Sequence, residues 1–69
     1  MELKWEENAQ IRIRTEGGDV IISANRAGLH SLSNHLLSLA GEPAGSHLHL
    51  DADNALEDGS QPCILEHIE

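Results

Sequence analysis

Three polar residues at alternate positions, His47, His49 and Asp51, have the types and spacing that could bind a metal ion. Residues two apart on a β-strand point to the same face and lie roughly 6–7 Å apart. Imidazole and carboxylate groups suit zinc, but a structural zinc site needs four ligands and a catalytic site needs three and a water. The same alternation is typical of a strand face that is exposed to solvent or to a partner. We therefore keep the three residues as candidate metal ligands but expect no bound metal and no other cofactor.

An acidic segment, Asp51–Ser60, follows directly and could bind calcium or a basic protein. An EF-hand loop needs glycine at its sixth position, and that position here is Leu56, so this class of calcium site is excluded. Two interpretations remain. The segment is either a soluble connection rich in turn-forming Asp and Asn, or a negative patch that attracts a basic partner through Asp53, Glu57 and Asp58.

The residues that could support catalysis do not combine into a known arrangement. Cys63 lies in an apolar run, where a small buried thiol is expected rather than a nucleophile beside a histidine base. Gly17 and Gly18 precede an apolar run typical of a strand, not a helix, which removes the geometry of a phosphate-binding loop. His30 and His35 are five residues apart and so lie on different faces of a helix. We expect a protein that is not an enzyme.

Composition narrows the classes of partner. The chain has 69 residues and a formal net charge of -8, with four Lys and Arg against twelve Asp and Glu. This charge repels nucleic acid and anionic membranes, and Trp5 is the only aromatic side chain, so bases have no stacking surface. No apolar run is long enough to span a membrane, and the first residues lack the layout of a secretory signal. We expect a cytoplasmic protein with a basic partner.

The elements that would position these residues follow from periodicity and turn signals. Alternating residues predict strands over 10–14 and 47–51, and a β-branched run predicts a strand over 19–23 that is covered on both faces. Gly17-Gly18 suits a tight hairpin turn between the first two strands. A last strand is expected over 63–68, after Pro62.

A helix is expected over residues 25–40. Ser23 or Asn25 can cap its first turn, and Gly41 suits a left-handed residue at its end. Its predicted buried face consists of leucines with one alanine at helical spacing: Leu29, Leu32, Leu36, Leu37, Leu39 and Ala40. The opposite face is polar but carries no charge: Ser31, Ser33, Asn34, His35 and Ser38. Solvent-exposed helices usually carry Glu and Lys pairs on such a face, so we regard it as a candidate contact surface.

The order strand, strand, helix, strand, strand predicts a single α+β domain over residues 1–69. We expect two layers, with one helix packed on a mostly antiparallel sheet of four strands. One helix covers one face of a sheet, so the other face is exposed to solvent or covered by a second chain. If a second copy of the chain covers that face, the protein is a homodimer.

Three stretches carry a resemblance to a known family. They are the helix from Ala27 to Ala40 with its Gly-Leu-x-x-Leu-x-Asn-His-Leu-Leu pattern, Gly45-Ser46-His47-Leu48-His49-Leu50-Asp51, and Leu56-Glu57-Asp58-Gly59-Ser60. Over roughly residues 20 to 68 the chain resembles the immunity protein 32 family of bacterial polymorphic toxin systems. The resemblance implies a small cytoplasmic protein that binds and blocks a cognate toxin and has no catalytic activity.

The candidate partner-binding residues are Asn34, His35, His47, His49, Asp51, Asp53, Glu57 and Asp58. Two alternatives to toxin binding remain. One is a zinc-binding domain that uses His47, His49 and Asp51, and the other is a homo-oligomeric structural module whose free sheet face self-associates. Trp5 packs either on the edge of its own domain or in an interface.

Overall fold

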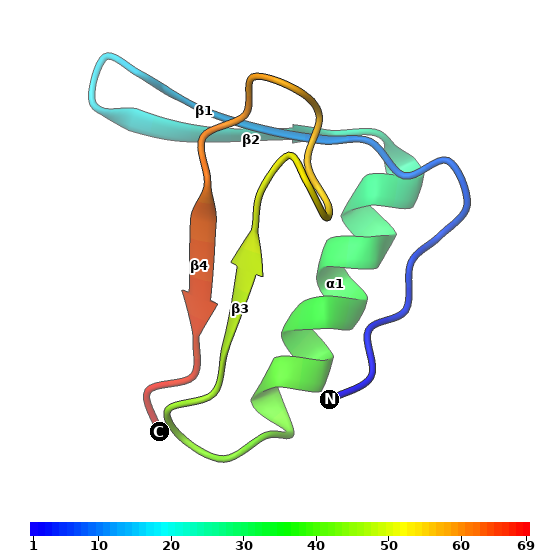
Figure 1. Ribbon diagram of the computed structural model, residues 1–69, viewed down its shortest axis with the longest axis vertical. Coiled ribbons are helices and arrows are strands. Elements are labelled where there is room, and N and C mark those ends of the chain that lie inside the picture. Colours follow the sequence, from blue (N-terminus) through cyan, green and yellow to red (C-terminus); the bar gives the residue numbers. More distant parts are fainter.

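The computed structural model describes all 69 residues and contains one helix and four strands, as predicted. Their order is β1 (Ile11–Glu16), β2 (Asp19–Ala24), α1 (Arg26–Ala40), β3 (His47–Leu50) and β4 (Cys63–Glu66). The β1–β2 hairpin lies across one end of both α1 and the β3–β4 hairpin (Figure 1). The molecule is flat, 32 × 30 × 19 Å, and its helix is too short and too polar to cross a membrane.

The first hairpin forms as its sequence pattern predicts. Ile11 and Ile13 are buried while Arg12 and Arg14 point to solvent, so the alternation of β1 separates core from surface. Gly17 and Gly18 make the two-residue turn with φ values of 58° and 89°, which side chains with a Cβ rarely adopt.

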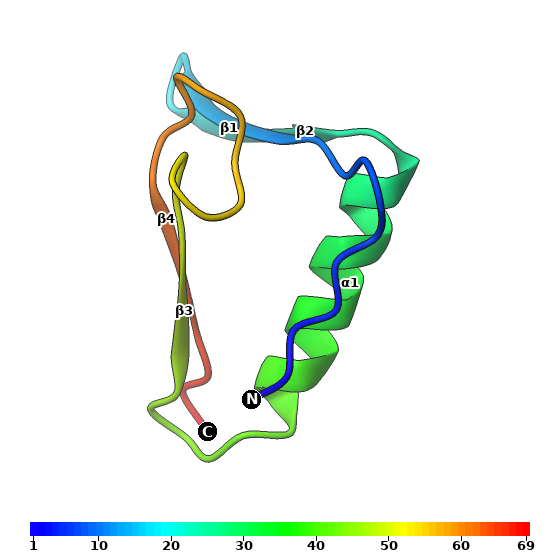
Figure 2. The same ribbon diagram turned by 45° about the vertical axis from the view of Figure 1, so that its right-hand side comes forward.

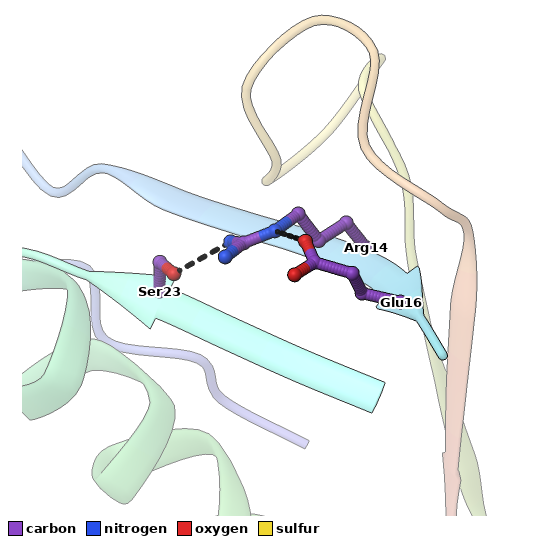
Figure 3. Close-up of polar contacts among 3 residues, drawn as sticks. All are labelled: Arg14, Glu16 and Ser23. Atoms are coloured by element: carbon purple, nitrogen blue, oxygen red, sulfur yellow. Dashed lines mark hydrogen bonds and ion pairs between the residues drawn. The ribbon is translucent and has the colours of Figure 1, made fainter. Parts of the chain in front are cut away.

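On the solvent-exposed side of the β1–β2 hairpin, Arg14 bridges the two strands. Its Nη1 donates to Ser23 Oγ at 3.0 Å, and its Nε lies 3.2 Å from Glu16 Oε2 (Figure 3). The ion pair is exposed and contributes little stability, about 0–1 kcal/mol.

The prediction of one four-stranded sheet is wrong. The four strands form two separate antiparallel pairs, β1 with β2 and β3 with β4. The free edge of β1 is occupied by the connection between β3 and β4 instead of by a third strand. The Ile11 carbonyl accepts from Glu57 N–H at 2.8 Å, and the Ile13 carbonyl accepts from Gln61 N–H at 2.7 Å. Ile13 N–H donates to Ser60 Oγ at 3.2 Å, so the connection uses both carbonyls of these two residues and one of their N–H groups.

The expectation that the second strand is covered on both faces is also wrong. Val20 and Ile22 lie opposite Thr15 and Ile13 in the register, yet both remain exposed. A sheet of two strands is too narrow for β2 to be central, so its far edge has no neighbouring strand.

The helix begins as expected at Asn25, whose Oδ1 accepts from Gly28 N–H at 2.8 Å. The predicted left-handed residue at its end is absent, because Gly41 has φ -85° and ψ -4°. The last turn tightens instead, with Gly41 N–H donating to the Ser38 carbonyl at 3.2 Å and Glu42 N–H to the Leu39 carbonyl at 3.1 Å.

The predicted buried face of the helix is correct for Leu39, which is buried, and in part for Leu32, which is half-buried, but is wrong for the other residues. The buried residues are spaced three or four apart but are mostly small or polar: Gly28, Ser31, His35 and Leu39. Leu29, Leu36 and Leu37 remain 54%, 52% and 71% exposed. Small residues allow a close approach, because a Cβ on Gly28 would lie 2.4 Å from the Gln10 carbonyl oxygen and 3.0 Å from Ile11 Cγ1.

Residues 1–10, here called the N-terminal arm, cover the polar side of the helix. The arm runs along α1 in both views (Figures 1 and 2). Glu6 N–H donates to Ser31 Oγ at 2.8 Å, and Ser38 Oγ donates to the Glu2 carbonyl at 2.8 Å. The arm therefore covers the part of the uncharged face that contains Ser31, His35 and Ser38, whereas Ser33 stays exposed to solvent.

The core lies where the two hairpins meet. Ile11 and Ile13 of β1 pack with Leu50 of β3 and with Leu56 of the connection, and all four are at most 5% exposed. Each such side chain contributes roughly 1.5–3 kcal/mol on burial. Half-buried Leu32, Cys63 and Leu65 surround them, so the small buried thiol expected at position 63 lies at the edge of the core.

Candidate protein-binding surface

The acidic connection, Asp51–Ser60, consists of a hydrogen-bonded turn followed by a segment that packs on β1. Asp51 Oδ1 accepts from Asp53 N–H at 2.9 Å, and the Asp51 carbonyl accepts from the N–H groups of Asn54, Ala55 and Leu56. The Asn54 side chain closes the same turn, with Oδ1 accepting from Asp51 N–H and Nδ2 donating to the His49 carbonyl. The Asp51 carboxylate thus shapes the turn, a positioning role that residue type and spacing did not reveal.

The second half of the connection is held on β1. Besides the three hydrogen bonds to Ile11 and Ile13, Arg12 Nη1 donates to the Asp58 carbonyl at 3.1 Å. Gly59 has φ 85°, a conformation that favours glycine. Asp53 and Asp58 have exposed side chains, and Glu57 is half-buried. These carboxylates are therefore presented by a backbone that is fixed at both ends of the segment.

The two strand histidines lie on the outward face of the β3–β4 hairpin. In the register His47 faces Glu66 and His49 faces Ile64, while Leu48 and Leu50 point to the core as predicted. The rings of His47 and His49 are 5.1 Å apart in an edge-to-face arrangement. His47, His49, Ile64 and Glu66 form what we call the outer face.

The structure does not bring His47, His49 and Asp51 together as metal ligands. No group of three or more His, Cys, Asp or Glu side chains is arranged so that it could hold a metal ion. The Asp51 carboxylate is turned to its own loop, and His47 Nδ1 lies 3.3 Å from the Gly45 carbonyl oxygen.

The candidates Asn34 and His35 lie on α1, outside the acidic connection and the outer face. His35 is fully buried, its ring centroid is 4.1 Å from that of Trp5, and neither of its ring nitrogens has a hydrogen-bond partner. Burial without a compensating hydrogen bond lowers the pKa of His35 below its usual 6.5. Asn34 is half-buried and borders a pocket beside Glu2 and Lys4 of the arm. Trp5 packs on its own chain, yet 43% of it remains exposed.

The net charge alone does not reveal that acidic and basic residues are distributed unevenly along the chain. All four Lys and Arg residues lie at or before Arg26, and none follows it. After Arg26 come seven acidic residues: Glu42, Asp51, Asp53, Glu57, Asp58, Glu66 and Glu69. The connection and the β3–β4 hairpin therefore contain no Lys or Arg of their own. Splitting the charge count at the helix would have identified this from the sequence.

Comparison with known proteins gives one match. No curated protein and no solved structure matches the chain. The family model of immunity protein 32 matches residues 19–68. This range contains α1, the β3–β4 hairpin and the acidic connection between its two strands. Gly28 and Ser60 lie within the match, and so do the hydrogen bonds that form the turn of the acidic connection. β1 and the N-terminal arm precede the matched residues. The chain therefore belongs to the immunity protein 32 family, a family of non-catalytic proteins that neutralise a cognate toxin.

Proposed function

We propose that the chain neutralises a basic toxin by binding it through the acidic connection and the adjoining outer face. The observation that carries this proposal is the charge of residues 27–69, which include seven acidic residues and no Lys or Arg. Such a surface attracts a basic protein and repels other acidic ones, which raises the association rate and the specificity.

The fixed backbone of the connection supports the same proposal. A loop that is already ordered loses little conformational entropy when it binds, so more of the contact energy appears as affinity. The bonds of Asp51, Asn54 and Ser60 supply this order, while Asp53 and Asp58 remain exposed for contact. Glu57 is half-buried, so we assign it a supporting role.

Beside the charges, the outer face offers groups suited to specific recognition. His47 and His49 can each donate and accept hydrogen bonds, and Ile64, which lies opposite His49 on β4, is 60% exposed. We propose that these residues of the outer face contact the toxin and that the acidic residues of the connection surround this contact. A surface of this composition is typical of protein interfaces that are formed between independently folded partners.

We also propose that residues 1–69 act as one domain and that the chain meets its toxin in the cytoplasm. The support for one domain is the docking of Glu57 and Gln61 on β1, which joins the two ends of the chain in a shared core. Thermal unfolding would then show one cooperative transition, whether it is followed by far-UV circular dichroism or by Trp5 fluorescence.

A homodimer is a second candidate assembly. Exposed leucines on the helix, Leu29, Leu36 and Leu37, are the observation that favours it. The net charge of -8 on each copy opposes it, because like charges repel. Sedimentation at low and high salt decides between a monomer and a dimer, and a dimer held by these leucines becomes tighter when salt screens the repulsion.

Affinity capture tests the toxin proposal. The tagged chain is incubated with lysate of its source cells, washed at low and high salt, and the retained proteins are quantified by mass spectrometry. One basic toxin protein is expected in equal amount, and its retention falls as salt rises. The Asp53→Asn variant is expected to retain less of it, whereas Asp19→Asn, which neutralises an exposed Asp in the distant β1–β2 turn, serves as the matched control. If the toxin is expressed but not retained, or if the two variants retain equal amounts, the proposed contact is wrong.

A further inference from the structure

A pocket lies between the N-terminal arm and the acidic connection, and neither the family nor the charge of the chain assigns a role to it. Its volume is about 410 Å³, and its walls include Trp5, Glu6 and Asn8 from the arm and Asp53 and Asn54 from the connection. We call it the Trp5 pocket. It joins two segments that are about 45 residues apart in the sequence, so no motif in the sequence could have indicated it.

The wall chemistry of the Trp5 pocket suits an organic cation. Glu6 and Asp53 supply two carboxylates, and no Lys or Arg borders the pocket. Trp5 supplies the aromatic ring that attracts cations most strongly, and its exposed fraction of 43% leaves indole surface free. Alanine and leucine side chains complete the wall and suit the methylene stem of a long basic side chain.

The charges of the pocket are not neutralised by the chain itself. Lys4, the basic residue next to Trp5, borders a different pocket beside Glu2 and Ser38. The only basic side chain at Glu6 is His30, with Nδ1 3.5 Å from Glu6 Oε1, and both groups are well exposed. Asp53 uses its backbone N–H to close the turn, and its carboxylate makes no hydrogen bond.

The other large pocket lacks this combination. It has a volume of about 570 Å³ and lies beside Glu57 and Asp58, but Arg12 forms part of its wall and donates to the Asp58 carbonyl. A cation there would face an existing guanidinium and would find no aromatic ring.

The indole wall is also held in place before any ligand binds. The Trp5 ring packs edge to face on the buried His35 ring, and Glu6 N–H is bonded to Ser31 Oγ. These contacts fix Trp5 and Glu6, two of the arm residues that line the pocket, to the helix. A preformed aromatic wall favours a planar group that can stack on it and bond to carboxylates at the same time, which is the property of guanidinium rather than ammonium.

We propose that the Trp5 pocket binds an arginine side chain on the surface of the toxin. This inference rests on the proposed function and names one contact of the interface. It also explains why the only aromatic residue of the chain lies on an arm outside the helix and strands. Trp5 would act as a binding residue, and His35 as the residue that positions it.

Trp5 provides the readout, since it is the only aromatic fluorophore of the chain. Three short capped peptides are titrated against the full chain: one with a central arginine, one with lysine and one with citrulline, the uncharged counterpart of arginine. The arginine peptide is expected to change Trp5 emission in a saturable manner and at lower concentration than lysine, and citrulline is expected to have no effect. Asp53→Asn is expected to weaken the binding of the arginine peptide about tenfold, because a charge-assisted hydrogen bond is lost. Asp19→Asn, which removes an exposed carboxylate at the β1–β2 turn outside the pocket, is expected to leave binding of the arginine peptide unchanged.

Equal responses to arginine and citrulline, or equal effects of Asp53→Asn and Asp19→Asn, would overturn the proposal. The peptide titration needs no toxin, so its outcome is separate from that of affinity capture. If capture retains a toxin and the arginine peptide leaves Trp5 unchanged, only the pocket is wrong. If the peptide binds as expected and no toxin is retained, the assignment of the arginine to a toxin is wrong.

Discussion

Replacing Gly28 by alanine tests whether β1 and the arm truly pack on the helix through a position without a side chain. The new Cβ would lie 2.4 Å from the Gln10 carbonyl oxygen and 3.0 Å from both Ala24 Cβ and Ile11 Cγ1. The carbonyl belongs to the backbone and already accepts from Asn25 N–H at 3.1 Å, so it cannot move without weakening that bond.

Two effects of opposite sign set the magnitude. Alanine is favoured over glycine inside a helix by about 1 kcal/mol. Overpacking a close contact costs about 1–3 kcal/mol, and a contact this short lies at the upper end or beyond. We expect Gly28→Ala to lower the free energy of unfolding by about 1–3 kcal/mol.

The assay is urea unfolding followed by far-UV circular dichroism, with Gly41→Ala as the matched control. A Cβ on Gly41 would meet only the carbonyl oxygens of Ser38 at 3.5 Å and Leu37 at 3.9 Å, and φ there is -85°, so alanine fits without strain. That variant is expected to be unchanged or stabilised by about 0.4–1 kcal/mol. If Gly28→Ala is as stable as the unmodified chain, β1 does not approach the helix as described.

Three further predictions concern buried polar groups and the arm. Since burial lowers the pKa of His35 in the folded state, its contribution to stability is complete above about pH 6.5 and is lost as the pH falls below it. Urea unfolding at pH 7.5 and 5.5 should show a fall that is smaller in His35→Leu. Ser60→Ala should destabilise the chain by about 1–3 kcal/mol in the same assay, because Ile13 N–H loses its acceptor, whereas Ser33→Ala on the exposed helix surface should change little. Glu6→Pro removes the donor to Ser31 and should shift Trp5 emission to longer wavelength, as more of the indole becomes exposed to water.

Local patterns predicted the elements because each depends on neighbours in the sequence. The alternation of Ile11 and Ile13, the turn glycines and the Asn25 cap all operate over a few residues, and the structure contains them. Residue spacing also predicted that Leu48 and Leu50 point inward.

The association of the elements was not predictable from the same patterns. The edge of β1 is occupied by an irregular segment whose contacts are mostly backbone groups and the Ser60 hydroxyl, and periodicity does not detect such contacts. The helix buries Gly28, Ser31 and His35 rather than Leu29 and Leu36, because small residues let the arm and β1 come close. A hydrophobic pattern identifies the side chains that gain most from burial, but not the positions that allow close packing.

The candidate site was predicted in part for the same reason. The acidic connection and the strand histidines were found by composition and alternation, whereas the roles of Asp51 and Asn54 in forming the turn depend on hydrogen bonds across it. His35 was expected on a polar surface and lies under Trp5, because the arm covers that face.

The binding proposed above, in which this chain blocks a basic toxin one to one through an acidic surface, can be tested by toxin inhibition. The direct measurement is the activity of the retained toxin as the purified chain is added, at low and high salt. Activity is expected to fall to its background value at one equivalent at low salt, and more chain is expected to be needed at high salt or with Asp53→Asn. A toxin that stays fully active with excess chain bound, or an inhibition that is independent of salt and of Asp53, would contradict the proposed binding.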